Sequence, residues 1–452
     1  MTTLAAAILQ APNPTHGSLT GEGAWRFALQ AWLPGFAAAR VGSATVGSST
    51  VGPDRAWVDM TQFVQGIETF RGSNQFGGSP EVGTALMRLK SANHELAPWM
   101  RNPASWGGYG FDFRPGLLMR VVVFSGSTWF PLFTGEVERW TGRFGQDAVE
   151  PHVEVTLLDT VGARLAQSYH RLFDSPLLIT RVDDQLDEIL TSARWPYGRR
   201  LFNANVAGST WYAKGSTPNP LDIERGSLEL ARDVAAGAQL AVFADAAGRI
   251  LVRLVRPTLG SRQPNDLSPA SPTLALSDDD LEHGVEITTD VEAMINRASY
   301  TFADQTYVFE NPQSIEQYGL REFVDSFPRQ GVPTLAEEND YLAGLVAKRA
   351  HLIDRIDEVT LTGTRHDLQR SVELGSPFTI DASPRRTNYA INATGFVRSI
   401  EHSIVPRHAN AIHWATRFGL DTYELSSFEA EPGGLTYKGD TLTFNGDVLT
   451  YP

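Results

Sequence analysis

Apolar and polar positions between residues 114 and 166 form short blocks that predict an antiparallel meander. Three blocks rich in Val, Phe and Trp cover residues 117–124, 129–140 and 153–158, and clusters of Gly, Ser and Asp separate them. Such blocks, bounded by turn-forming residues, are typical of strands joined by tight turns. This stretch is therefore predicted to fold as a small β-sheet.

The same spacing of small residues occurs a second time near the other end of the chain. Gly116 is followed by Gly135 after nineteen residues, and Gly375 is followed by Gly395 after twenty. The sequences around these anchors agree in order, as TGEVERW and TGFVRSI illustrate. A third pair of anchors, twenty residues further on in each copy, is Val155 and Ala415. We predict from this repeat that the chain contains two copies of one small β-barrel.

Between the two copies the pattern changes to helical spacing. Thr180 and Asp183 fit a capping box, and the apolar residues around them fall on one face of a helix: Val182, Leu186, Ile189 and Leu190. A second helix is predicted over residues 228–236 and ends at Gly237. Two strands joined by a tight turn at residues 246–248 come next. Helices packed on a small sheet indicate an α+β middle domain.

The region that follows begins with residues 257–284, which are rich in Pro, Ser and Asp and predict a linker. Two strand segments, VEITTD and INRASYTFADQTYVFEN, come after it. A helix is then predicted from about residue 335 to 356, with these apolar residues on or near one face: Tyr341, Leu345, Leu352 and Ile356. The second barrel is predicted to resume at Glu358.

Both ends of the chain have distinctive compositions. Residues 41–52 repeat Val-Gly without any charge, which fits either a flexible arm or a strand that a neighbouring subunit completes. Residues 434–452 contain three Leu-Thr phrases separated by turn residues. They predict a small meander or arm that needs a partner surface, because strands this short are marginally stable alone.

These patterns predict a mainly β protein, α+β as a whole, in which two antiparallel β-barrels flank the α+β middle domain. The predicted domains are an N-terminal arm at 1–54, a first β-barrel at 55–168, the α+β middle domain at 169–275, connecting strands and a helix at 276–357, the remainder of the second β-barrel at 358–425 and a C-terminal β arm at 426–452.

Composition narrows the class of protein. A chain of 452 residues with 42% hydrophobic residues is expected to form about three globular domains. The absence of cysteine excludes disulfides, thiolate metal sites and cysteine nucleophiles. A net charge of −14 argues against holding nucleic acid through its phosphates. No apolar run reaches the roughly 18 residues of a membrane span, and no basic flank precedes the N-terminus, so we expect a soluble protein made in the cytoplasm.

Two polar clusters are candidates for metal binding. The acidic cluster comprises Asp278, Asp279, Asp280, Glu282 and His283. It lacks the glycine and ligand spacing of an EF-hand loop, which favours a solvated acidic turn. The histidine cluster comprises His402, His408 and His413. Zinc would require more closely paired ligands or a helix to present them, so surface or strand histidines are the favoured interpretation.

Catalytic motifs are missing from the sequence. It contains no Gly-x-Ser-x-Gly elbow, His-Glu-x-x-His helix or phosphate-binding Gly-Lys-Ser/Thr loop, and the glycines at 107–110 precede a strand where a phosphate loop would precede a helix. A cell-wall hydrolase would need a positioned acid such as Glu188 or Glu338. Both fall on predicted helices whose apolar neighbours have core spacing, so an exposed helix face explains them better. We therefore assign no catalytic, cofactor-binding or metal-ligating residue.

Several phrases resemble a known family in order and position. WVDMTQFVQGIETFRGSNQF, RPGLLMRV, PLFTGEVERW and VEVTLLDTVGARLA resemble the N-terminal barrel of minor tail proteins, of the baseplate or tail-tip hub type, from long-tailed phages that infect actinobacteria. SIEQYGLREF and IEHSIVP are similar to phrases in the later half of those hubs. The resemblance covers roughly residues 55–425 and includes no catalytic motif. The Val-Gly segment and the Leu-Thr meander lie outside it.

The resemblance implies two tail-tube-like barrels per chain and a homotrimer, so that six barrels form a ring. It further implies a structural, non-enzymatic component of the virion, located at the tail tip and assembled in the host cytoplasm. Its expected partners are the distal tail protein, the tape-measure protein and other tip or fibre proteins. DNA would pass through the ring without specific binding, and part of the negative charge would face the channel and repel phosphate.

Two other functions stay open on the sequence alone. One is a cell-wall-degrading tail component, which release of soluble fragments from actinobacterial cell walls would reveal. The other is a carbohydrate-binding tip protein, because the following aromatic residues in Gly- and Pro-rich loops could stack on sugars: Trp99, Trp106, Trp211 and Tyr212. Trp99 and Trp106, with Tyr109, could equally form a surface for a protein partner or cap the open end of the first barrel.

Overall fold

A computed structural model describes most of the strand-rich regions of the chain. The described residues are 19–20, 25–34, 55–74, 80–91, 96, 113–125, 128–143, 151–170, 182–195, 225–237, 240–254, 273–281, 285–291, 294–302, 305–325, 335–362, 365–382, 389–406, 412–429 and four residue pairs between 436 and 448.

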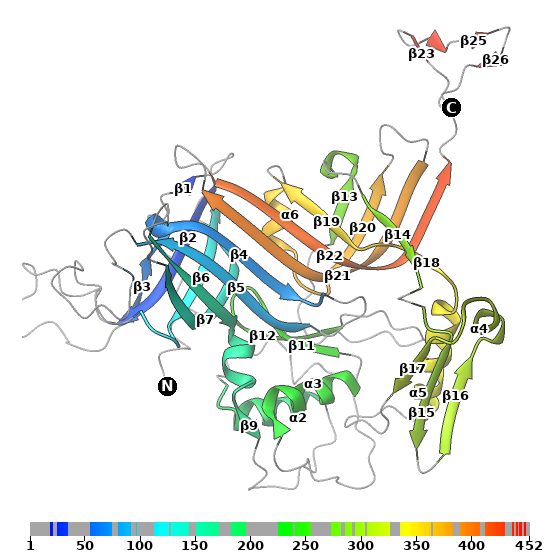
Figure 1. Ribbon diagram of the computed structural model, residues 1–452, viewed down its shortest axis with the longest axis horizontal. Helices are drawn as coiled ribbons and strands as arrows, with labels where there is room; N and C mark the ends of the chain where they lie inside the picture. Colours follow the sequence, from blue (N-terminus) through cyan, green and yellow to red (C-terminus); the bar gives the residue numbers. More distant parts are fainter. Residues whose placement is uncertain are drawn as a thin grey trace, which may run out of the picture.

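The protein is mostly β, and among the described residues thirteen strands belong to one large, mainly antiparallel sheet (Figure 1). The main path through it runs β1-β2-β6-β7-β8-β5-β4-β21-β20-β13, while β3 pairs with β2 and β22 pairs with both β21 and β19. The strands are β1 Leu19–Thr20, β2 Trp25–Pro34, β3 Arg55–Asp59, β4 Val64–Gly72, β5 Glu81–Lys90, β6 Leu118–Ser125, β7 Thr128–Arg143, β8 His152–Asp159, β13 Leu274–Ser277, β19 Glu358–Thr362, β20 Pro377–Ala382, β21 Tyr389–Pro406 and β22 Ile412–Glu429.

The expected pair of closed barrels is not found in the described part of the chain. Instead, β4 pairs on one edge with β5 and on the other edge with residues 399–404 of β21. The two halves of the repeat are therefore joined edge to edge, and this continuity leaves the hydrogen-bonded path open. The prediction of a large antiparallel β structure is confirmed, while closure into two barrels is not.

The predicted duplication is visible in the strand order. We call β5, β6, β7 and β8 the first strand unit, and β19, β20, β21 and β22 the second strand unit. Neighbouring strands follow the order β6-β7-β8-β5 in the first unit and β20-β21-β22-β19 in the second. Each unit thus reproduces the same non-sequential arrangement, in which the strand that comes first along the chain lies beside the one that comes last.

Equivalent hydrogen bonds lie at the glycine anchors of the two units. In the first unit, Gly116 N donates to Val137 O over 2.7 Å and Val137 N donates to Leu117 O over 2.8 Å. In the second unit, Gly375 N donates to Val397 O and Val397 N donates to Ser376 O, each over 2.8 Å. Gly116 and Gly375 have φ of +83° and +74°, a conformation that favours glycine.

The second pair of anchors is equally well matched. A Cβ added at Gly135 would lie far too close to the carbonyl oxygen of Leu158, and one added at Gly395 would collide with the carbonyl oxygen of Asp421. Just beyond each glycine, the pairing with the next strand has an irregularity, between 137 and 139 in β7 and between 397 and 399 in β21. Both glycines therefore allow the neighbouring strand to approach closely, next to the same irregularity in each unit.

The third pair of anchors was placed incorrectly by the sequence. Val155 lies opposite Trp140, whereas the residue opposite the equivalent Ile400 is Phe418 and not Ala415. Phe418 comes eighteen residues after Ile400, whereas Val155 comes fifteen after Trp140, so the equivalent position is three residues later than the equal spacing indicated.

The second strand unit contributes to the hydrophobic core of the first. The core enclosed by β2, β5, β6, β7 and β8 also contains Ile404 and Trp414, which come from β21 and β22 and are almost fully buried. A second core lies against the second strand unit and includes Phe378, Ile400 and Phe418. The ends of β21 and β22 therefore complete the first core, as the two long strands in Figure 1 indicate by reaching over the first unit.

Two helices and a hairpin form the middle of the chain. Helices α2 (Val182–Ser192) and α3 (Ser227–Gly237) and strands β11 (Leu240–Ala244) and β12 (Ile250–Leu254) follow the sequence prediction closely. Two-residue strands β9 (Tyr169–His170) and β10 (Arg225–Gly226) also pair there. One face of the hairpin packs on α2, α3 and the turn of π-helix at Val161–Leu165, and its other face packs on the second core.

Residues that follow position 290 form a second, small sheet, which lies at the lower right of Figure 1. It consists of β15 (Arg297–Phe302), β16 (Gln305–Glu310) and β17 (Glu322–Asp325), with α4 (Pro312–Tyr318) between the last two and α5 (Leu335–Arg349) packed on one face. The predicted helix over 335–356 is therefore too long. Its last residues form β18 (Ile353–Ile356), which pairs with β14 (Ile287–Asp290), so Leu352 and Ile356 are not on the helix.

The predicted linker over 257–284 also needs correction. Its alternating apolar residues Leu274 and Leu276 are buried, and β13 pairs in parallel with β20 at the edge of the large sheet. At the C-terminus, short ladders join β23 (Thr436–Tyr437) with β24 (Asp440–Thr441) and β25 (Thr443–Phe444) with β26 (Asp447–Val448). None of the helices in the described residues is long and apolar enough to cross a membrane.

Candidate functional site

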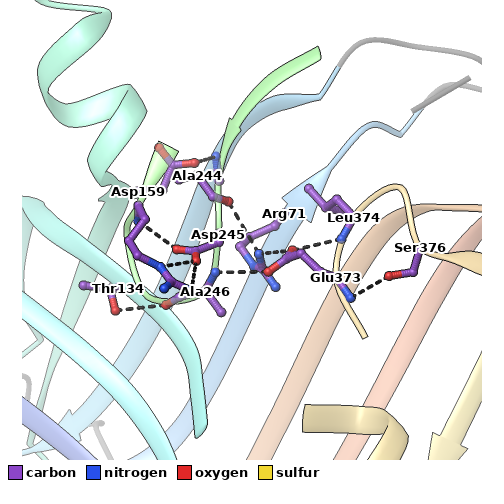
Figure 2. Close-up of polar contacts among 11 residues, drawn as sticks. Arg71, Thr134, Asp159, Ala244, Asp245, Ala246, Glu373, Leu374 and Ser376 are labelled. Atoms are coloured by element: carbon purple, nitrogen blue, oxygen red, sulfur yellow. Dashed lines mark hydrogen bonds and ion pairs between the residues drawn. The ribbon is translucent and has the colours of Figure 1, made fainter. Parts of the chain in front are cut away.

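The part of the structure that holds the strand units and the middle hairpin together is a buried polar junction. We define it by Arg71 of β4, Asp159 of β8, Glu373 before β20 and the hairpin turn at residues 245–249. Figure 2 shows these groups converging from four parts of the chain that are far apart in sequence. The arrangement positions the two units relative to each other, so it is the site on which any function of the duplicated sheet depends.

The hairpin turn is held from both strand units. Thr134 Oγ1 of β7 and Thr160 Oγ1 after β8 each donate over 2.9 Å, to the carbonyl oxygens of Ala246 and Gly248. From the second unit, Glu373 Oε2 accepts from Ala246 N over 3.3 Å. Gly248 has φ of +77°, and a Cβ there would press on Thr160, so glycine is required in this turn. The hairpin thus connects the two units through backbone atoms.

An ion pair crosses the junction directly. Arg71 Nη1 lies 2.5 Å from Glu373 Oε1, and their side chains are 4% and 15% exposed. Glu373 also accepts from Leu374 N over 2.9 Å, and Ser376 Oγ receives the Glu373 N–H over 3.0 Å. A charge pair this buried costs desolvation, and it is tolerated because additional hydrogen bonds satisfy the carboxylate. Arg71 and Glu373 therefore fix the orientation of one unit against the other.

Asp159 forms the most buried carboxyl of the junction. It accepts from Gly83 N and Gly162 N, each over 2.6 Å. Desolvation by burial raises the pKa of Asp159 to about 6, although these two hydrogen bonds and the charges of Arg71 and Arg232 act to lower it. The carboxyl thus joins the start of β5 to the turn after β8, at the base of the first unit.

Asp245 in the hairpin turn is paired with its own neighbour. Its carboxylate accepts from Arg249 N and Arg249 Nε over 2.7 Å in each case. Burial raises the pKa of Asp245, Arg249 lowers it, and the charge of Glu373 raises it again. This carboxylate closes the turn and does not reach solvent, which favours a structural role.

The exposed face of the large sheet carries charges in cross-strand pairs. Arg143 Nε of β7 lies 3.0 Å from Glu154 of β8, and Arg88 of β5 lies 3.7 Å from the same carboxylate. Hydrogen bonding by Arg143 lowers the pKa of Glu154. Arg417 of β22 pairs in the same way with Glu401 of β21. In these pairs the acidic groups are balanced by neighbouring arginines.

One residue of the acidic cluster, Asp280, is buried and has a structural role. Asp280 accepts from Ser277 N and Oγ, each over 3.0 Å, and from Arg365 Nη1 over 2.5 Å. Burial acts to raise the pKa of Asp280, but these hydrogen bonds outweigh it and leave the pKa below its usual value. Asp279 is exposed, while the side chain of Asp278 and residues Glu282 and His283 lie outside the described residues.

The histidines are not brought together. His402 is buried in β21, with Nδ1 2.9 Å from Thr416 Oγ1, and burial lowers its pKa to about 3, with Arg71 contributing. His413 is half-buried on β22 opposite Val405, and His408 lies outside the described residues. The described part of the chain contains no group of three or more metal-ligating side chains.

The other residues named from the sequence are described only in part. Glu188 is exposed on α2, as an ordinary helix face would be, and the side chain of Glu338 on α5 is outside the described residues. The aromatic and glycine candidates also fall outside them: Trp99, Trp106, 107–110, Trp211 and Tyr212. Sequence reasoning missed Arg71 and Glu373, because nothing along the chain marks two charges 302 residues apart as partners.

Comparison with known proteins gives structural similarities only. No protein-family model matches the chain, and no curated protein matches it. Among solved structures, it is similar to a tail protein from Neisseria meningitidis at 12% identity and a TM-score of 0.47, over 89% of this chain and 97% of that one. It is also similar to the 43 kDa tail protein of prophage MuSo2 from Shewanella oneidensis, at 12% identity and a TM-score of 0.49, over 87% and 96%.

A third similarity is to a component of the Escherichia coli type VI secretion system, described as structurally similar to the T4 phage tail proteins gp27 and gp5. Its identity is 11% and its TM-score 0.38, over 80% of this chain and 74% of that one. Because every one of these TM-scores is below 0.5, we base no functional conclusion on them.

Proposed function

We propose that this protein is a structural hub of a phage tail tip, in which three copies form a ring of six strand units around a channel. The observation that carries the proposal is the duplicated unit, with its matched glycine anchors and hydrogen bonds. Two equivalent units per chain allow a threefold assembly to present six similar positions, which is what a sixfold tube requires of its end. The resemblance of the sequence to phage tail hubs supports the same conclusion.

The buried junction supports an assembly role. The carboxylate of Glu373 is bonded by Arg71 and by the backbone N–H groups of Ala246 and Leu374, and these contacts would hold the two units at one angle. A fixed angle is necessary for copies to close into a ring, because any freedom at the junction would accumulate around it. The proposal assigns no catalytic role to the chain.

The exposed face of the large sheet is the proposed channel wall. Cross-strand pairs such as Arg143 with Glu154 and Arg417 with Glu401 leave few isolated positive charges on it. A wall of this kind would not retain phosphate, because tight binding to DNA requires unpaired basic groups. The acidic lumen expected from the net charge stays a prediction.

The proposed partners are the distal tail protein and tape-measure protein on one side of the ring and tip or fibre proteins on the other. The proposed location is the tail tip of the virion. The short C-terminal ladders and the Val-Gly segment are proposed to contact these partners.

Measuring the mass of the purified full chain by light scattering and mass photometry tests the proposal. The expected assembled species has three times the 49.5 kDa of one chain. Addition of the distal tail protein from the same phage provides the template if the free chain is monomeric. A dimer or tetramer, or a monomer in the presence of that protein, would overturn the proposal.

A further inference from the structure

The first strand unit is joined to the second through β4, which pairs with β5 on one edge and with β21 on the other. We call the contact between β4 and β21 the internal seam. Along it, residues 67–72 of β4 pair antiparallel with 399–404 of β21. Ile67 and Ile404 lie opposite each other and are 1% and 0% exposed. The seam is therefore a continuous antiparallel strand contact, with one buried apolar pair at its end, that could be repeated wherever the same two edges occur.

The second unit contains a counterpart of β4. Asp159 and Thr422 lie opposite the equivalent glycines Gly135 and Gly395, and each side chain accepts a backbone N–H from the next strand. The donor is Gly83 N of β5 in one case and Ile356 N of β18 in the other. Thus β18 occupies, in the second unit, the position that the start of β5 occupies in the first. Since β14 pairs with β18 on the edge away from β22, β14 takes the place of β4.

The outer edge of β14 resembles an uncovered seam. Within the described residues, β14 pairs with β18 alone, so its second edge has no strand beside it. Ile287 lies opposite Ile356, which is fully buried, yet Ile287 itself is 39% exposed. The equivalent positions on β4 face β21 and are buried. An apolar side chain on the core side of an exposed strand edge indicates that another strand covers it in the assembly.

The complementary edge is found on β7. Residues 399–404 of β21 have β22 on one side and β4 on the other, whereas the equivalent stretch of β7 from residue 138 pairs with β8 alone in the described part of the chain. Trp140 lies at this edge, and its Nε1 is buried without a hydrogen-bond partner among the described groups. The first unit thus has the open edge that β14 would need.

We infer that β14 of one copy pairs antiparallel with residues 138–143 of β7 in a second copy, repeating the internal seam between chains. This rests on the proposed function, in which copies form a ring, and it names the surfaces that join them. The register follows from the buried positions of the next strand. Val359 lies opposite Phe418 as Met87 lies opposite Val155, and the buried residues that precede them are Ile356 and Ala85. Ile287 is opposite Ile356 and Thr69 is opposite Ala85, so Ile287 corresponds to Thr69 and Val285 to Ile67. This register places Thr288 opposite Thr141 of the second copy, as Phe70 lies opposite Glu401 within the chain.

Charge complementarity supports this partner. The same register places Glu286, which is exposed, opposite Arg143, whose side chain is 61% exposed. Opposite charges on directly paired residues of neighbouring strands stabilise the pairing, and like charges weaken it. The covering strand therefore belongs to a second copy of this chain.

Because the sequence contains no cysteine, only introduced cysteines can form disulfides in a cross-linking test. A chain carrying both Thr288→Cys and Thr141→Cys is purified, assembled and oxidised with copper phenanthroline, then analysed without reductant. The expected product is a covalent series that ends at three chains. A chain with Glu68→Cys and Ser403→Cys, which are paired across the internal seam, should form its disulfide within one chain and serves as the geometric control. A chain with Thr288→Cys and Glu229→Cys, the latter exposed on α3, should not be linked.

The outcomes separate the inference from the proposed function. If the unmodified chain is trimeric and the Thr288/Thr141 pair stays unlinked while the internal control links, this seam is wrong and the trimeric hub stands. If the chain never assembles, alone or on the distal tail protein, both fail. A covalent series that continues past three chains would support the seam and refute the closed threefold ring.

A charge exchange tests the seam without any cysteine. Glu286→Arg should weaken assembly about fivefold, because it places two positive charges opposite each other. Adding Arg143→Glu in the same chain should restore assembly. Arg143→Glu alone is measured beside them, because it also breaks the pair with Glu154. If the effects of the two single changes are simply additive in the double variant, the two residues do not face each other. Melting curves of each chain confirm that the variants are folded.

Discussion

The ion pair between Arg71 and Glu373 provides the sharpest test of the junction. Both side chains are largely buried, and Glu373 also accepts a hydrogen bond from Leu374 N. Glu373→Ala leaves Arg71 buried without its nearest counterion, a change that typically costs about 3–5 kcal/mol. Arg71→Met removes the charge at the other end and is expected to cost a similar amount. The double variant should lose less than the sum, because neither charge is then left alone.

The assay is urea denaturation followed by intrinsic tryptophan fluorescence, with the four chains of the double-mutant cycle measured together. We expect a coupling energy of at least about 2 kcal/mol. Glu401→Ala is the matched control, since its partner Arg417 is half exposed and the pair lies on the surface of the same sheet. That loss should stay below about 1 kcal/mol. Additive losses at Arg71 and Glu373, or a loss no larger than that of the control, would refute the account of the junction.

Two further predictions follow from buried groups of the same sheet. Because burial raises the pKa of Asp159 from 3.8 to about 6, the charged carboxylate disfavours the folded state. The stability of the native protein relative to Asp159→Asn should therefore be greatest below pH 4 and fall by about 3 kcal/mol as the pH rises through 6. A pH-independent difference would contradict this. Gly395→Ala should cost at least about 2 kcal/mol, because the new Cβ collides with the carbonyl of Asp421. Gly66→Ala, which has open space around it, should change the melting temperature little, and equal effects of the two substitutions would disprove the steric argument.

The duplication could be predicted from the sequence because glycines mark it. Gly116 and Gly375 need a positive φ, and Gly135 and Gly395 allow a close strand crossing, so the same residue type recurs at the same spacing. The helices of the middle domain were also predictable. In the first of them, Leu186, Ile189 and Leu190 recur at helical spacing and are buried. In both cases the determining interaction is local or periodic.

Features that depend on distant partners could not be predicted. The strand at Leu274–Ser277 lies in a Pro- and Ser-rich stretch, and only its pairing with β20 makes it a strand. The helix α5 ends before Ile353 because Ile353–Ile356 pair with β14 as a strand. Arg71, Asp159 and Glu373 come from three separate regions, and their roles follow from burial, which a sequence pattern does not report.

The placement of Ile404 and Trp414 inside the first core has a consequence for synthesis of the protein. During translation the N-terminal strands leave the ribosome more than two hundred residues before the strands that finish their interior. Until then the first core lacks Ile404 and Trp414, and a nascent chain in this state exposes apolar surface. We therefore expect the first core to be completed late in the production of the chain. An isolated N-terminal fragment is expected to aggregate, even though its sequence looks like a complete domain.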